Sequence, residues 1–311
     1  MNELLQININ KNNISNILKV ILILFLFITY NKLKDKIILE MLRHYNLDIE
    51  KHKEIINLGE GGFLELYNNY NRTIQIERKS RNIYKSDIMF LIIPGGAYER
   101  LMRHEQIPVA KKFYSLGYSS SILKYSVYPK HYPTNYNQGL KAIRILSLKY
   151  SKIILVGFSA GGHLAGILGT TEREKLFNTV GMILCCPVIS FVNKYHEKSR
   201  YNFLGNINAN KTIYHKLFSV ENRVKNDTLP TFIWTLKYDK IVPYQNTLYM
   251  VEKLKKNNVK FKYIIFKEGR HGMGLADETA IRFGIKEFKN KEVAKWVKLS
   301  CDFMEKIIKN N

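Results

Sequence analysis

Ser159 lies between two glycines in the stretch Gly157-Phe158-Ser159-Ala160-Gly161, directly after the apolar run 152–156. A buried strand followed by G-x-S-x-G is typical of a nucleophile elbow, a tight turn that lifts a serine hydroxyl above a sheet. The flanking glycines allow the backbone to turn sharply and neighbouring segments to come close. Because a serine hydroxyl is a weak nucleophile at neutral pH, this chemistry also needs a base within hydrogen-bond reach.

The base and the acid that orients it are expected later in the chain, in the order Ser, Asp or Glu, His. Four of the eight histidines follow Ser159, and only His271 also lies beyond the last acid that follows a predicted strand. Asp239 comes directly after the predicted strand 231–236, at the end where ligands bind in such sheets, whereas Asp227 precedes that strand. The order therefore predicts Ser159 as nucleophile, Asp239 as the orienting acid and His271 as base.

Acyl transfer through a serine also needs backbone N–H groups that face the developing oxyanion. One is expected from Ala160, the residue after the nucleophile, and the others from the loop 92–99, which reads IIPGGAYE. This loop predicts Gly96 and Ala97 as donors, with Gly95 allowing a close backbone approach.

Other polar and aromatic side chains near the motif are interpreted as structural. His163 lies one helical turn after Ser159 and is interpreted as a packing residue. Tyr98 and Tyr125 are assigned to the core or the pocket wall, without a chemical role.

Short strands alternate with helices from residue 60 onward, which predicts β-α-β units and a mostly parallel sheet. Residues 62–66 and 73–77 are expected to pair as an antiparallel hairpin. The loop-rich stretch 190–230 is expected to cover the carboxyl edge of the sheet. An apolar stripe at helical spacing predicts a packed C-terminal helix. A buried parallel strand is expected at 88–93, and further strands are expected at 120–127, 152–156, 182–186, 231–236 and 261–266.

The composition is that of an ordinary globular protein except for its charge. The 311 residues carry 49 basic and 26 acidic side chains, a net charge of +23, spread along the chain without a tight basic block. We interpret this as a compositional bias and expect no nucleic-acid partner, because no recognised nucleic-acid motif accompanies it. The three cysteines do not make a disulfide framework, and Cys185 and Cys186 are interpreted as small core residues.

The N-terminal stretch ILKVILILFLFITY, residues 17–30, is strongly apolar apart from Lys19. It is shorter than the roughly 20 residues that span a bilayer and has the length of a signal-peptide core, although no small-residue cleavage site follows it. The apolar run with lysines on both sides favours an export signal or an uncleaved membrane anchor, and hence a secreted or membrane-attached protein, over a core or interfacial helix. Residues 1–56 are therefore assigned to this segment and a polar linker, and residues 57–311 to a catalytic domain.

The ordered set of motifs resembles the α/β-hydrolase superfamily, and more narrowly its small esterases of the acetylxylan esterase-like or feruloyl esterase-like kind. The resemblance implies a central sheet of about eight mostly parallel strands with helices on both faces. It also implies the same three roles: Ser159 as nucleophile, Asp239 as acid and His271 as base. Ala97 departs from the pattern, because a third glycine is common at that position. The motifs are PGGAYE, EQIPVAKKFYSLGY, LKYSVYPKHYP, GFSAGGHLAG, CCPVIS, SVENRV, YDKIVPYQN and RHGMGLA.

The resemblance leads to the prediction of a serine-dependent hydrolase of small-molecule carboxylic esters with short acyl groups, such as acetylated carbohydrate. Neither a metal nor an organic cofactor is expected. Two other classes stay open: a serine peptidase or acyltransferase with the same triad, and a non-catalytic binding protein on a hydrolase scaffold.

Overall fold

The computed structural model describes residues 53–69, 75–76, 83–280 and 288–310. The apolar run 17–30 lies outside the described residues. Within the described ranges, no helix has both the length and the apolar character needed to cross a membrane. Strand β1 (Lys53–Gly59) begins before residue 57, so residues 53–56 belong to the sheet and not to the linker assigned from the sequence.

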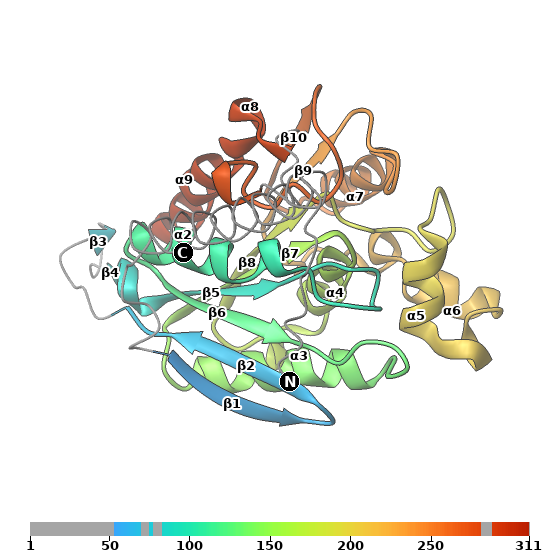
Figure 1. The fold of residues 1–311 in the computed structure, drawn as a ribbon, viewed down its shortest axis with the longest axis horizontal. Helices are drawn as coiled ribbons and strands as arrows, with labels where there is room; N and C mark the ends of the chain where they lie inside the picture. Colours follow the sequence, from blue (N-terminus) through green and yellow to red (C-terminus); the bar gives the residue numbers. More distant parts are fainter. Residues whose placement is uncertain (1–52, 70–74, 77–82, 281–287, 311) are drawn as a thin grey trace, which may run out of the picture. The chain divides into compact units, whose positions relative to one another are not determined.

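Eight strands form one mixed sheet in the order β1-β2-β6-β5-β7-β8-β9-β10 (Figure 1). The pairs from β6 to β10 are parallel, whereas β2 runs antiparallel to both β1 and β6. This is the mostly parallel, eight-stranded arrangement that the sequence predicts. The remaining strands are β2 (Gly62–Tyr67), β5 (Ile88–Ile93), β6 (Ser119–Lys124), β7 (Lys152–Phe158), β8 (Thr179–Cys185), β9 (Thr231–Leu236) and β10 (Phe261–Phe266).

Helices pack on both faces of the sheet, as predicted. One apolar core lies under α3 (Thr134–Ser147), α4 (Ser159–Gly169) and α7 (Gln245–Lys256). The other lies under α2 (Ile107–Ser115), α8 (Lys291–Ala294) and α9 (Trp296–Asn310). The predicted C-terminal stripe is buried in this second core: Val293, Trp296, Val297, Cys301, Met304 and Ile308. The strands from β5 to β9 are buried along their length except at Lys124 and Lys152, which explains their apolar runs.

The predicted hairpin between residues 62–66 and 73–77 is wrong. Strand β2 pairs with β1 on one side and with β6 on the other, while β3 (Gln75–Ile76) pairs with β4 (Ile83–Tyr84) in a separate small sheet. The β1–β2 turn is made by Gly59, Glu60 and Gly61, all with positive φ. Two glycines at such positions favour a tight turn here, and this local signal determines the pairing.

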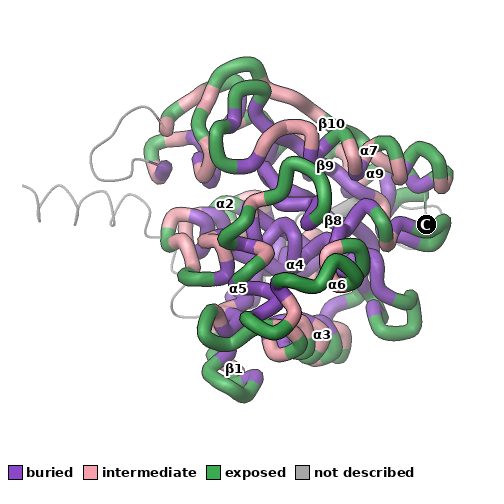
Figure 2. Tube along the Cα trace, turned by 90° about the vertical axis from the view of Figure 1, so that its right-hand side faces the viewer, coloured by how far each residue is buried: buried purple, intermediate pink, exposed green. Residues whose placement is uncertain are grey.

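The stretch 190–230 contains two helices, α5 (Glu197–Asn208) and α6 (Thr212–Leu217), which together we call the cap. A view turned by 90° shows both with many exposed residues (Figure 2). A short 3₁₀ turn, Val220–Arg223, follows them and contains Glu221, which is 6% exposed.

Glu221 provides a test of stability against pH. Burial raises the pKa of its carboxyl group, and a hydrogen bond with Ser190 only partly opposes this shift. The folded state therefore holds the proton more tightly than the unfolded state, so ionisation of Glu221 costs stability as the pH rises. We expect Glu221→Gln to raise the Tm clearly at pH 8 and to change it little at pH 4.

Thermal unfolding followed by circular dichroism at both pH values measures this difference. Glu174→Gln, at an exposed acid, is the matched control and should show no such pH dependence. An equal change in Tm at pH 4 and pH 8 for Glu221→Gln would contradict the assignment.

Candidate active site

Ser159 is the first residue of α4, immediately after β7 ends at Phe158. Its φ is +51°, a left-handed conformation that non-glycine residues seldom adopt. The surrounding structure must hold this strain, which is common for residues at functional sites. The strained serine at a strand-to-helix turn is the elbow that the sequence predicts.

The two glycines of the motif are required by space rather than by backbone conformation. A Cβ on Gly161 would lie 2.1 Å from the carbonyl oxygen of Ile93 and 2.4 Å from that of Pro94. A Cβ on Gly157 would lie 2.5 Å from the carbonyl oxygen of Gly161. The end of β5 and the start of α4 therefore touch backbone to backbone, which only glycine permits.

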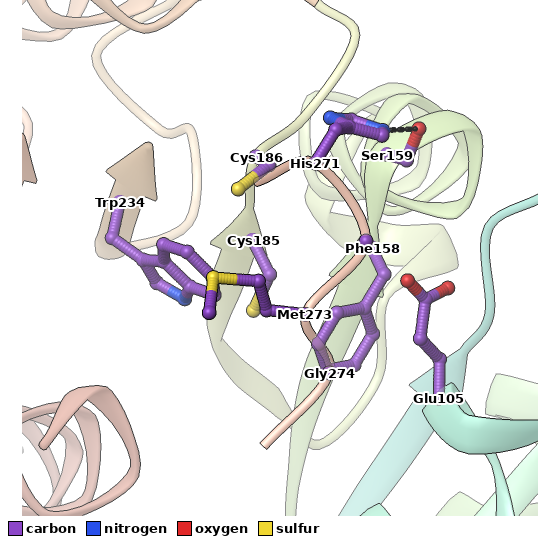
Figure 3. A pocket seen from close by; sticks show the side chains of 10 residues that line it. Glu105, Phe158, Ser159, Cys185, Cys186, Trp234, His271, Met273 and Gly274 are labelled. Carbon is purple, nitrogen blue, oxygen red and sulfur yellow. Dashed lines mark hydrogen bonds between the residues drawn. The ribbon is translucent and has the colours of Figure 1, made fainter. Parts of the chain in front are cut away.

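The structure brings Ser159, His271 and Asp239 together in one chain of hydrogen bonds. The Nε2 atom of His271 lies 2.8 Å from Ser159 Oγ, and its Nδ1 atom lies 2.7 Å from Asp239 Oδ2 (Figure 3 shows the first of these). Since a carboxylate only accepts, the proton lies on Nδ1 and Nε2 is free to accept from the serine hydroxyl. This is the geometry that a serine–histidine pair needs for general-base catalysis.

Asp239 is held by the backbone of the residues that follow it. Its side chain is fully buried, and Oδ1 accepts hydrogen bonds of 2.9 Å from the N–H groups of Ile241 and Val242. These bonds fix the carboxylate so that Oδ2 faces the imidazole. His271 itself is 13% exposed and so lies at the boundary between the core and solvent.

The loop that carries Gly96 and Ala97 lies directly against the elbow. A Cβ on Gly95 would lie 2.7 Å from the carbonyl oxygen of Phe158 and 2.9 Å from Ser159 Cβ. Gly96 has φ +127° and Ala97 has φ +57°, so both use conformations that suit glycine. The Gly96 and Ala97 N–H groups, with that of Ala160 in the first turn of α4, stay predicted oxyanion donors.

His163 has the structural role predicted for it. Its ring is buried, with Nδ1 2.9 Å from the Tyr98 hydroxyl and Nε2 2.7 Å from the carbonyl oxygen of Phe218. Burial lowers the pKa of His163 to about 3, so the ring is neutral. It stacks on Phe191 at 4.1 Å between ring centroids and joins α4 to the cap.

The cap makes direct contact with the loop after β5. Asn202 of α5 donates a hydrogen bond of 2.9 Å from Nδ2 to the carbonyl oxygen of Ala97. Lys198 pairs with Glu99 at 2.8 Å. The stretch 190–230 therefore lies at the carboxyl edge of the sheet, as the sequence predicts.

A small hollow lies beside Ser159 and His271. Apolar side chains of Phe158, Trp234 and Met273 line it, as do Glu105 and Cys186 (Figure 3). Cys186 is buried in the second apolar core, as the sequence predicts. Sequence reasoning missed Glu105, because an acid in a turn before a helix gives no sign of its burial.

Cys186, Asp239 and His271 also place one potential metal ligand each within 4.8 Å of one another. However, Asp239 and His271 already bind each other, and burial raises the pKa of the Cys186 thiol, which disfavours the thiolate that metals bind. The arrangement therefore suits proton transfer better than metal binding. The expectation that no metal or organic cofactor is required stays a prediction.

The fold and the site define a hydrolase of the α/β-hydrolase fold, which confirms the resemblance found in the sequence. The chain belongs to the prolyl oligopeptidase family, whose sequence pattern matches residues 141–308.

Individual relatives fall among esterases and xylan-degrading enzymes. Endo-1,4-beta-xylanase B of Butyrivibrio fibrisolvens is 30% identical over 215 residues, which cover 62% of this chain and 33% of that protein. The acetylxylan esterase of Xylanibacter ruminicola is 26% identical over 195 residues, 59% of this chain and 40% of that protein. The chain thus matches less than half the length of each.

A solved structure matches over nearly its whole length. The acetyl ester-xyloside bifunctional hydrolase from Caldicellulosiruptor lactoaceticus has a TM-score of 0.67 and 28% sequence identity. The match covers 82% of this chain and 96% of that one.

The backbone contact at Gly161 leads to a prediction about stability. The methyl group of Gly161→Ala would meet two carbonyl oxygens that cannot move without disturbing β5, so we expect a loss of about 3 kcal/mol in the free energy of unfolding. In Gly169→Ala, a control in the same helix, the new Cβ would meet Met182 Sδ at 2.5 Å, and this flexible side chain can move aside. Urea unfolding measures both variants, and equal losses would contradict the argument.

Proposed function

We propose that this protein is a serine-dependent carboxylic ester hydrolase that acts on short acyl esters. The observation that carries the proposal is the continuous hydrogen-bond chain from Ser159 through His271 to Asp239. The relatives support the same class, because they include an acetylxylan esterase and an acetyl ester-xyloside hydrolase. We therefore propose an acylated carbohydrate as the substrate.

The proposed reaction has two halves. His271 Nε2 takes the proton of the Ser159 hydroxyl as Oγ attacks the ester carbonyl, and Asp239 stabilises the imidazolium that forms. The N–H groups of Gly96, Ala97 and Ala160 donate to the oxyanion of the tetrahedral intermediate. The imidazolium then protonates the leaving alcohol, an acyl-enzyme remains on Ser159, and water activated by His271 releases the acid.

Replacing Ser159 by Ala tests the nucleophile. We expect kcat for p-nitrophenyl acetate to fall by a factor of at least about 10⁴, because no covalent intermediate can form. Reaction with a fluorophosphonate probe should be lost as well. Ser147→Ala, at a serine whose hydroxyl only donates to the carbonyl oxygen of Arg144, is the matched control. Retention of a tenth of the wild-type rate by Ser159→Ala would overturn the assignment.

The composition of the cap region leads to a preference for short acyl groups. The stretch 190–230 is mostly polar, and its few apolar residues do not form a continuous helical stripe. Each buried methylene would contribute only about 0.8 kcal/mol, so a long chain gains affinity only where a continuous apolar surface receives it. We expect kcat/KM for nitrophenyl esters to be highest for acyl groups of about two to four carbons and to fall steadily toward palmitate. A maximum at about eight carbons or more would indicate a lipase instead.

A peptidase activity is the second candidate, favoured by the match to the prolyl oligopeptidase family. The triad alone does not separate ester from amide cleavage, because both reactions pass through the same acyl-enzyme. Comparing p-nitrophenyl acetate with aminoacyl anilides discriminates between the two classes. A non-catalytic binding protein would react with neither substrate and would not be labelled by the fluorophosphonate.

We further propose that the protein is exported or attached to a membrane through residues 17–30. The support comes from the sequence alone, namely the apolar run and the lysines on either side of it. Fractionation of cells that produce the full chain into membrane, soluble and external fractions tests this proposal.

A further inference from the structure

Glu105 is a buried acid that the proposed reaction does not use. It ends the 3₁₀ turn Arg103–Glu105, just before α2, and it is only 1% exposed. A buried carboxylate is costly unless N–H groups satisfy it. Its Oε2 atom accepts a hydrogen bond of 2.8 Å from the N–H of Gly95. The acid therefore binds the backbone at the start of the loop that carries Gly96 and Ala97.

The adjacent residue binds a different loop. The Nε2 atom of His104 lies 2.7 Å from the carbonyl oxygen of Gly272, the residue after His271. Because a carbonyl only accepts, His104 donates this bond. The same Nε2 lies 3.6 Å from Glu105 Oε1, so the two side chains also face each other. Two consecutive residues thus hold the two loops from which the proposed oxyanion donors and the proposed base come.

Gly95 is also closely surrounded at its Cα, where there is no space for a side chain. A Cβ there would lie 2.7 Å from the carbonyl oxygen of Phe158 and 3.0 Å from Glu105 Oε2. The peptide before Gly95 is therefore clamped between the elbow and the acid. The two following peptide groups are also held through their carbonyl oxygens, because Met102 N–H donates to Gly95 and Glu99 N–H donates to Gly96. Glu105 supplies the restraint at the N–H of Gly95, and its loss would loosen the loop at that end.

We propose that Glu105 is a positioning residue that fixes the peptide groups of Gly96 and Ala97 in the orientation in which they stabilise the oxyanion. His104 completes the arrangement by holding the His271 loop at a set distance from them. This inference rests on the proposed ester hydrolysis. The physical reason is preorganisation, because donors that need no rearrangement stabilise the transition state far more than the bound substrate.

The test compares Glu105→Ala, which removes the acceptor, with Glu105→Gln, which keeps an oxygen to accept from Gly95. For p-nitrophenyl acetate we expect Glu105→Ala to lower kcat by about 10- to 100-fold, with KM changed by less than about threefold. Glu105→Gln should recover at least about half of the lost factor on a logarithmic scale. Glu221→Ala removes another buried carboxylate, outside these loops, and is the matched control.

A second readout separates positioning from a general loss of structure. A boronic acid forms a tetrahedral adduct on the serine, so its affinity depends on the oxyanion donors as the transition state does. Across the wild type and the two Glu105 variants, we expect log Ki for phenylboronic acid to rise in proportion to log (KM/kcat) for the ester. The Tm of Glu105→Gln should stay within a few degrees of the wild-type Tm. Should Glu105→Ala fail to fold, the Glu105→Gln variant alone still tests the correlation.

Two outcomes would overturn the inference: wild-type kcat in Glu105→Ala, or equal losses in Glu105→Ala and Glu105→Gln with unchanged boronate affinity. Failure of the proposed function looks different. In that case the wild-type protein itself would neither hydrolyse the ester nor react with a fluorophosphonate.

Discussion

The contact between the end of β5 and the start of α4 is the constraint on which the site depends. Gly161 lies against the carbonyl oxygens of Ile93 and Pro94, and Gly95 lies against the carbonyl oxygen of Phe158. The two turns therefore interlock, each with a glycine facing the backbone of the other. This is feasible because β5 and β7 are neighbours in register, with Ile93 opposite Gly157. The interlock holds the strained φ of Ser159 and sets the distance from its hydroxyl to the loop after β5.

Sequence reasoning recovered the parts of this arrangement that leave a local signal. Buried parallel strands read as apolar runs, and catalytic groups at their carboxyl ends fall in a fixed chain order, so Ser159, Asp239 and His271 could be identified as a set. The strands that pair with β2 could not be identified in this way, because period-two alternation shows that a strand exists without showing what it pairs with. Glu105 could not be identified either, because its role depends on its burial and on its contact with the N–H of Gly95, and no local pattern shows them.

The cap belongs to the site and is not an independent cover. Asn202 donates to the carbonyl oxygen of Ala97, and the Phe203 ring packs on Tyr98 at 5.0 Å between centroids. His163 connects Tyr98 to the carbonyl oxygen of Phe218 at the end of α6, so α4, the loop after β5 and the cap share one buried aromatic cluster. A change in the cap therefore reaches the predicted oxyanion donors through a short series of packed groups.

Two buried carboxylates hold the two sides of the site by the same physical means. Asp239 accepts from Ile241, Val242 and His271, and Glu105 accepts from Gly95. The chain has 49 lysine and arginine residues and only 26 acidic ones, so basic partners are abundant. Yet neither carboxylate has a lysine or arginine partner among the described ion pairs. Backbone N–H groups and histidine rings satisfy them instead. Such donors are fixed by the fold, whereas a lysine would bring a flexible side chain, so the carboxylates can set the loop positions that the proposed acyl transfer requires.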